Sequence, residues 1–65
     1  MTGEQFTEWM ARMGWNIITT AERLGLGRNT VARYRKEGAP DHIAYACAAL
    51  AMNLPKWGEG QTTNS

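Results

Sequence analysis

Residues 16–38 read NIITTAERLGLGRNTVARYRKEG, and this stretch decides the fold. Its first part carries three apolar residues at i, i+4 and i+7, on one face of a helix that starts at Asn16: Ile17, Ala21 and Leu24. Gly25 follows, and glycine takes the left-handed backbone that closes a helix without steric cost. The stretch therefore predicts two short helices joined by a tight turn.

The second of these helices is expected over residues 28–37, between Gly27 and Gly38. Val31 and Tyr34 are three residues apart and should face the interior. The same period then places a polar and basic set on the outward face: Arg28, Asn29, Ala32, Arg33 and Lys36.

Charge is concentrated in this region. Residues 23–36 hold five cations and no acid, a sum of +5, whereas residues 1–22 and 37–65 each sum to −2, which leaves the net charge of +1. The five cations are Arg23, Arg28, Arg33, Arg35 and Lys36. Such a local basic patch is suited to a polyanion, although a basic stretch can also be a solvated surface or pair with Glu22 or Glu37.

The flanking segments also predict helices. Thr2 and Gln5 form a capping-box pattern, Gly14 is a helix stop, and four apolar residues between them form one stripe: Phe6, Trp9, Met10 and Met13. A fourth helix is expected from Pro40, in its first turn, to about Met52. The fold class is therefore all-α, a small four-helix domain over residues 1–57 with a helix-turn-helix core at 16–38, followed by a flexible tail at 58–65.

The fourth helix, taken with its continuation as residues 40–54, has almost no polar face. A helix that is apolar all round must be buried all round, and a domain of this size cannot enclose it. We therefore expect a homodimer through this helix, with Trp57 either at the interface or covering its own core. The interface residues expected are Ile43, Cys47, Leu50, Ala51, Leu54 and Trp57.

Composition excludes several classes of protein. One cysteine and one histidine among 65 residues provide neither a disulfide nor a zinc site, and no cofactor or small-molecule ligand is evident. No apolar run reaches the ~20 residues of a membrane span, and no secretory signal is visible, so we expect a cytoplasmic protein. His42 beside Asp41 suggests a solvated helix terminus, so no enzyme is predicted.

The central stretch resembles the helix-turn-helix of Cro-like (XRE-type) repressors of bacteria and phages. The resemblance rests on Ala21 where the helices cross, Gly25 at the turn, and Leu26 with Val31 packing the second helix. Ile17 and Gly27 depart from the pattern, because that family commonly has glutamine and serine there. The short chain and the alanine-rich fourth helix also resemble the small anti-CRISPR-associated repressors of phages.

The resemblance implies that the helix over 28–37 enters the major groove of double-stranded DNA. Four residues would then contact bases: Arg28, Asn29, Ala32 and Arg33. Seven would contact the DNA backbone: Asn16, Thr19, Thr20, Arg23, Thr30, Arg35 and Lys36. The function implied is a dimeric transcriptional repressor that binds a palindromic operator and can act on its own operon.

An alternative keeps the fold and assigns it to protein binding, as in an antitoxin or an inhibitor. Exposed tryptophans would favour this alternative, because tryptophan is enriched at the energetic centres of protein interfaces. The candidates are Trp9, Trp15 and Trp57.

Overall fold

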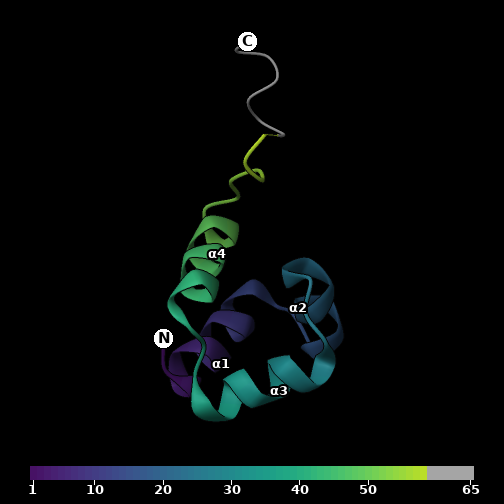
Figure 1. Cartoon of the computed structure of the whole chain (residues 1–65), viewed down its shortest axis with the longest axis vertical. Coiled ribbons are helices and arrows are strands. Elements are labelled where there is room, and N and C mark those ends of the chain that lie inside the picture. The colour runs from purple at the N-terminus through teal and green to yellow at the C-terminus, as the bar shows by residue number, and fades with distance from the viewer. Residues whose placement is uncertain (59–65) are drawn as a thin grey trace.

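The computed structural model describes residues 1–58, and these contain four helices and no strand. The helices are α1 (Gly3–Met13), α2 (Ile17–Leu24), α3 (Arg28–Glu37) and α4 (Asp41–Ala51) (Figure 1). The all-α prediction is confirmed. Apart from Gly58, the tail predicted at 58–65 lies outside the described residues.

The first two helices begin where the capping residues predict. The Thr2 hydroxyl accepts a hydrogen bond from the Gln5 backbone N–H at 3.1 Å, and the Gln5 side-chain oxygen accepts one from the Thr2 N–H at 2.9 Å. At the start of α2, Asn16 Oδ1 accepts the Thr19 N–H at 2.8 Å. These side chains satisfy backbone donors that a helix leaves unpaired in its first turn.

The turn between α2 and α3 is closed by Gly25, which has φ 69°. The Leu26 N–H then donates to the Ala21 carbonyl oxygen at 2.9 Å, and the Leu26 side chain packs against the core. A side chain at position 25 would be strained by the positive φ. The helix-turn-helix predicted from residues 16–38 is therefore present.

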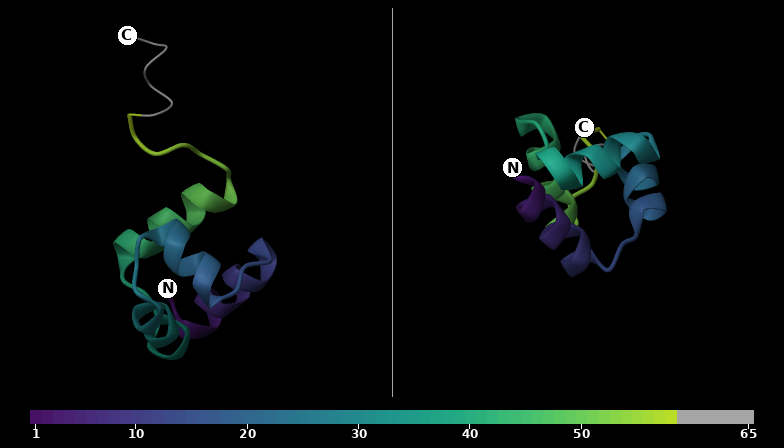
Figure 2. Two further views of the ribbon diagram at one scale, coloured as in Figure 1. Left: turned by 90° about the vertical axis from the view of Figure 1, so that its right-hand side faces the viewer. Right: turned by 90° about the horizontal axis from the view of Figure 1, so that it is seen from below.

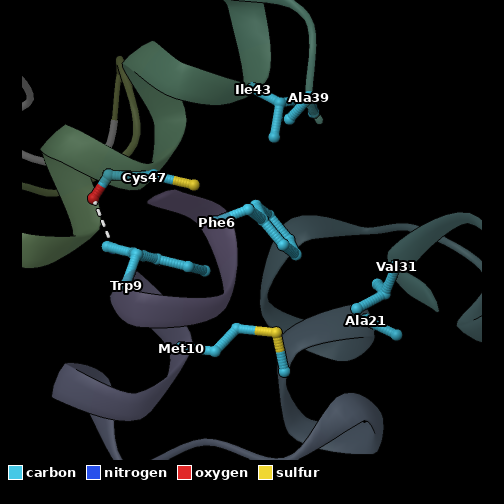
Figure 3. Close-up of a cluster of buried hydrophobic side chains, with 8 residues drawn as sticks. All are labelled: Phe6, Trp9, Met10, Ala21, Val31, Ala39, Ile43 and Cys47. Carbon is cyan, nitrogen blue, oxygen red and sulfur yellow. Dashed lines mark hydrogen bonds between the residues drawn. The ribbon is translucent and has the colours of Figure 1, made fainter. Parts of the chain in front are cut away.

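The core lies where α1, α2 and α3 meet, and α4 adds to it from one side (Figure 3). Phe6 and Val31 are completely buried at its centre. The other buried apolar residues are Trp9, Met10, Ala21, Ala39, Ile43 and Cys47. Figures 1 and 2 show α3 along one end of the domain and α4 leading away toward the opposite end.

The first turn of α1 supports the last turn of α3. Gly3 is buried so closely against α3 that a Cβ there would lie 2.5 Å from the Arg35 carbonyl oxygen. The Met1 carbonyl oxygen accepts the Ala39 N–H at 2.9 Å. These contacts fix the C-terminal end of α3 relative to the domain.

The fourth helix is shorter than the residues 40–54 expected from sequence. Pro40 is its N-cap, not a residue of its first turn, and the helix ends at Ala51. Asn53 then has φ 57°, a left-handed backbone that asparagine tolerates, so Leu54 lies beyond the helix.

The inner face of α4 packs on its own domain. Ile43 and Cys47 are 5% and 1% exposed, and Trp9 Nε1–H donates to the Cys47 carbonyl oxygen at 3.0 Å (Figure 3). The expectation that Ile43 and Cys47 contact a second copy is therefore wrong, because the stripe at i and i+4 faces the core. Leu50 is half-buried against the same core, whereas the rest of the expected interface is exposed: Ala51, Leu54 and Trp57. Trp57 is 91% exposed, which excludes the alternative that it covers its own core.

Candidate nucleic-acid interface

The α3 helix is anchored from behind by two side chains. Val31 is completely buried, and the ring of Tyr34 meets Phe6 edge-on, with the ring centroids 5.8 Å apart and an interplanar angle of 81°. Both inward positions were predicted. Because the anchors set the rotation of α3 about its axis, they also set which residues it presents outward.

The outward face of α3 is fully accessible. Asn29, Arg33 and Lys36 are spaced i, i+4 and i+7 along it, and all three are exposed, as are Arg28 and Ala32 beside them. The Arg33 guanidinium carbon lies 5.9 Å from the centroid of the Tyr34 ring. All five residues expected on this face therefore lie at the surface.

Among the described residues, no carboxylate is paired with a cation of α3. Arg12 and Glu8 form an ion pair on α1, 2.9 Å apart, but neither Glu22 nor Glu37 pairs with α3 within residues 1–58. The cations of α3 are thus free to attract phosphates, and the face has the uncompensated positive charge that a polyanion requires.

The flank of α3 brings in residues from the start of α2. Asn16 and Arg35 line the same groove, of about 540 Å³, although they are far apart in sequence. The capping bond occupies the Asn16 oxygen, so its amide N–H groups remain available as donors. Of the other expected backbone contacts, Lys36 is exposed, and Thr19 and Thr30 are half-buried.

Thr20 corrects the sequence-based assignment. Its side chain is 0% exposed, and its hydroxyl oxygen has no hydrogen-bond partner among the described residues. It therefore cannot contact a DNA backbone. The signal was present in the sequence, because Thr20 stands at i+3 in the stripe that also contains Ile17, Ala21 and Leu24.

Arg23 faces another part of the domain. Its guanidinium carbon lies 5.2 Å from the centroid of the Trp15 ring, a cation–π contact. It also lines a groove with Leu50 and Trp57. Arg23 thus belongs to the side of α2 that faces α4, not to the exposed face of α3. The sequence carries no local signal for this, because the Trp15 contact depends on how the α1–α2 connection folds back.

One thiol lies in the interior of the described part of the chain, that of Cys47. Burial raises the pKa of the Cys47 thiol to about 11, so it stays protonated near neutral pH. Among residues 1–58 no three potential metal ligands of the histidine, cysteine or acidic type lie together. Within the same range no helix has the length and apolarity that crossing a bilayer requires.

A comparison with known protein families assigns this chain to one of them. Residues 4–38, more than half of the chain, match the family described as bacterial regulatory protein, Fis family. The chain belongs to the Fis family. No curated protein and no solved structure matches it.

The Fis-family match covers nearly all of α1 and the whole of α2 and α3, and it stops before α4. It therefore contains the turn at Gly25, the anchors behind α3 and the whole outward face. The chain is a DNA-binding transcription regulator with a helix-turn-helix. The finer resemblances to Cro-like and anti-CRISPR-associated repressors stay predictions.

Proposed function

We propose that this Fis-family protein is a dimeric transcriptional repressor that reads an inverted repeat with α3 in the major groove. The observation that carries the proposal is the outward face of α3, which is exposed, basic and unpaired while Val31 and Tyr34 hold it from behind. A helix presented in this way has the shape and charge to enter the major groove.

Base reading is assigned to four residues of α3. The guanidinium groups of Arg28 and Arg33 match the O6 and N7 acceptors of guanine, and the Asn29 amide matches adenine N6 and N7. The Ala32 methyl group suits the thymine methyl group. Each bidentate pair contributes roughly 1–3 kcal/mol of discrimination.

Backbone contacts are assigned to residues on either side of this reading face. Arg35 and Lys36 lie at the C-terminal end of α3, and Asn16 lies across the groove from Arg35. Thr19 and Thr30 complete the set. Such contacts fix the register of a protein on DNA without reading its sequence.

Two copies are needed for specificity. Three base contacts give about 3–9 kcal/mol, whereas selecting one site among ~10⁶ competitors requires roughly 8 kcal/mol. One copy of α3 barely reaches this value, and two copies exceed it. A dimer bound over its own promoter would repress its own operon. We assign the protein to the small phage and mobile-element regulators of the anti-CRISPR-associated type, which would act in the cytoplasm of a bacterial cell.

Two substitutions on α3 separate base reading from backbone binding. Arg33→Ala should weaken binding to the preferred duplex by about 1–3 kcal/mol and relax the sequence preference, whereas Lys36→Ala should lower the slope of log K against log salt concentration by about 1. The preferred duplex is first selected from a random pool, and affinities are then measured by fluorescence anisotropy at several salt concentrations.

Arg12→Ala is the matched control, because Arg12 is an exposed arginine on α1 with a carboxylate partner. It should leave both the affinity and the preference unchanged. If the selected duplex binds equally well after Arg28 and Arg33 are both replaced by alanine, the proposed reading face is wrong.

A second candidate function is binding to another protein, as an antitoxin or inhibitor does. It is favoured by the 91% exposure of Trp57, but Trp9 is buried and Trp15 is half-buried. Absence of any duplex binding at low salt would support this candidate, because even non-specific DNA binding should be detectable there.

A further inference from the structure

An apolar surface remains uncovered at the end of the domain opposite α3. Tyr45, Met52, Leu54 and Trp57 are 77%, 71%, 52% and 91% exposed. Tyr45 and Ala48 lie at i and i+3 on one face of α4, and the C-cap Met52 continues this face at i+7. Leu54 and Trp57 follow past the end of the helix. We name these five residues the α4 outer surface.

This surface lies opposite the face that holds α4 in place. Ile43 and Cys47 are buried on the inner side of the helix, where the bond from Trp9 to the Cys47 carbonyl attaches it to α1. The outer residues are therefore not required by the domain's own core. Large apolar side chains left exposed together on a small domain indicate an interaction site.

The charge pattern fits a second copy of this chain. Residues 43–55 contain no aspartate, glutamate, lysine or arginine. In a symmetric pair each surface meets itself, so any charge near the centre of the contact would face the same charge. The α4 outer surface has no such charge, and its alanine at position 48 allows the two helices to approach closely.

The area is also sufficient for a dimer. The exposed parts of the four large side chains amount to roughly 600 Å² per chain, since an aromatic side chain alone carries 150–250 Å². Two such surfaces bury about 1,200 Å² in total, the lower limit for a specific stable interface. Tyrosine and tryptophan are also the residue types that dominate binding energy at such contacts.

A groove next to this surface can receive part of the partner. It has a volume of about 290 Å³ and lies between the end of α2 and α4, with Leu24, Ala46 and Leu50 among its apolar walls. A cavity of about 150 Å³ accommodates benzene, so an aromatic side chain fits here. Arg23, whose guanidinium lies over the Trp15 ring, also lines this groove.

We propose that the α4 outer surface is the homodimer interface, and that the adjoining groove receives an aromatic side chain of the second copy. This interface rests on the proposed function only because that function requires two copies of the chain. The contact is made by Tyr45, Met52 and Trp57, whereas Ile43 and Cys47 stay in the core of each copy. A second copy seated there leaves α3 uncovered, because α3 runs along the opposite end of the domain (Figures 1 and 2).

Sedimentation equilibrium of the DNA-free protein tests this interface. Met52→Glu should weaken dimerisation by roughly a hundredfold or more, because it buries an unpaired charge at the contact. Ile18→Glu is the matched control, since Ile18 is also a large exposed apolar residue but lies on α2, and its dimer should be intact. Thermal unfolding followed by circular dichroism verifies that each variant is folded.

Trp57→Ala is the second variant, in case Met52→Glu does not fold. It should also weaken the dimer, and it should abolish the concentration-dependent blue shift of tryptophan emission that burial of Trp57 causes in the wild type. Trp9 is buried and Trp15 half-buried in each chain, so Trp57 is the exposed reporter among the three.

A wild-type protein that stays monomeric at every concentration overturns this inference, as does a dimer that survives both Met52→Glu and Trp57→Ala. DNA binding distinguishes the two proposals. A monomer that still binds half-sites refutes the interface and leaves base reading intact. A dimer lost on Met52→Glu, from a protein that binds no duplex, supports the interface and refutes the proposed function.

Discussion

Cys47 lies on the inner face of α4, where its side chain is 1% exposed and its thiol cannot be hydrated. Burial raises the pKa of this thiol from its ordinary value of 9.0 to about 11. The thiol therefore acts as a small apolar side chain, and its charged form is incompatible with the packed core.

This shift predicts a loss of stability in alkaline solution. The pKa is about 11 in the folded chain and 9.0 when unfolded, so the unfolded chain loses the proton first. The contribution of the thiol is complete below pH 9 and falls as the pH rises from 9 to 11. At 1.36 kcal/mol per unit, the free energy of unfolding should drop by up to about 2–3 kcal/mol. Urea titrations at a series of pH values measure this free energy of unfolding.

Cys47→Ala serves as the control for this prediction. It should lower stability at neutral pH by leaving a cavity, but it should remove the thiol's part of the alkaline loss. An equally steep loss in the variant would show that Cys47 is not its source.

At the level of elements, Asn16 combines two roles at the start of α2. Its side-chain oxygen caps the helix through the Thr19 N–H, and its exposed position at the groove that Arg35 also lines suits a phosphate contact. The two roles use different atoms of one amide, so substitutions can separate them.

Asn16→Ala should destabilise the domain by about 1 kcal/mol, because the Thr19 N–H loses its acceptor. Asn16→Asp keeps an acceptor at the same place and should retain most of the stability, yet it should weaken DNA binding because a carboxylate repels phosphates. Urea unfolding and fluorescence anisotropy give the two quantities. Equal DNA affinities of the aspartate variant and the wild type would remove Asn16 from the backbone contacts.

The α3 helix depends on α1 as well as on the turn before it. The backbone of Gly3 packs closely against the carbonyl oxygens of Arg35 and Lys36, and Phe6 packs against Tyr34. The C-terminal end of α3 is thus held by Gly3, 32 positions before Arg35, and by Phe6, 28 positions before Tyr34. The Fis-family match begins at residue 4, so it includes Phe6 but not Gly3.

For the whole molecule, the proposed dimer predicts the spacing of its binding site. Two copies of α3 on one face of DNA should bind half-sites about 10–10.5 base pairs apart from centre to centre. Inserting about 5 base pairs turns one half-site to the other side of the helix, so affinity should fall to that of a single half-site. Electrophoretic mobility shift with both spacings measures this.

A duplex with a scrambled spacer of the original length is the control, and it should bind as tightly as the selected site. If the longer spacer binds equally well, the two α3 helices are not held in a fixed relation.

Much of the fold could be predicted from sequence because its signals are local. Thr2, Asn16, Gly14 and Gly25 end or begin helices through bonds and backbone angles within a few residues, and α1, α2 and α3 have the predicted bounds. The exposed set on α3 follows from the same short-range period once Val31 is placed inside.

The errors concern residues whose environment is set by distant parts of the chain. Ile43 and Cys47 form a stripe that could face either a partner or the core, and Trp9, thirty-eight residues from Cys47, contacts α4 on that side. Arg23 lies away from the outward face of α3, because its guanidinium packs over the Trp15 ring, 5.2 Å from the ring centroid.

The sequence by itself determined the four-helix order, the turn at Gly25 and the basic residues that α3 presents, because each depends on neighbours within about one helical turn. Only the tertiary structure decided which face of α4 is buried, that Thr20 lies inside, and that the α4 outer surface is left without a cover. An apolar helix has several faces of similar hydrophobicity, and only the packing of α1 against it selects one.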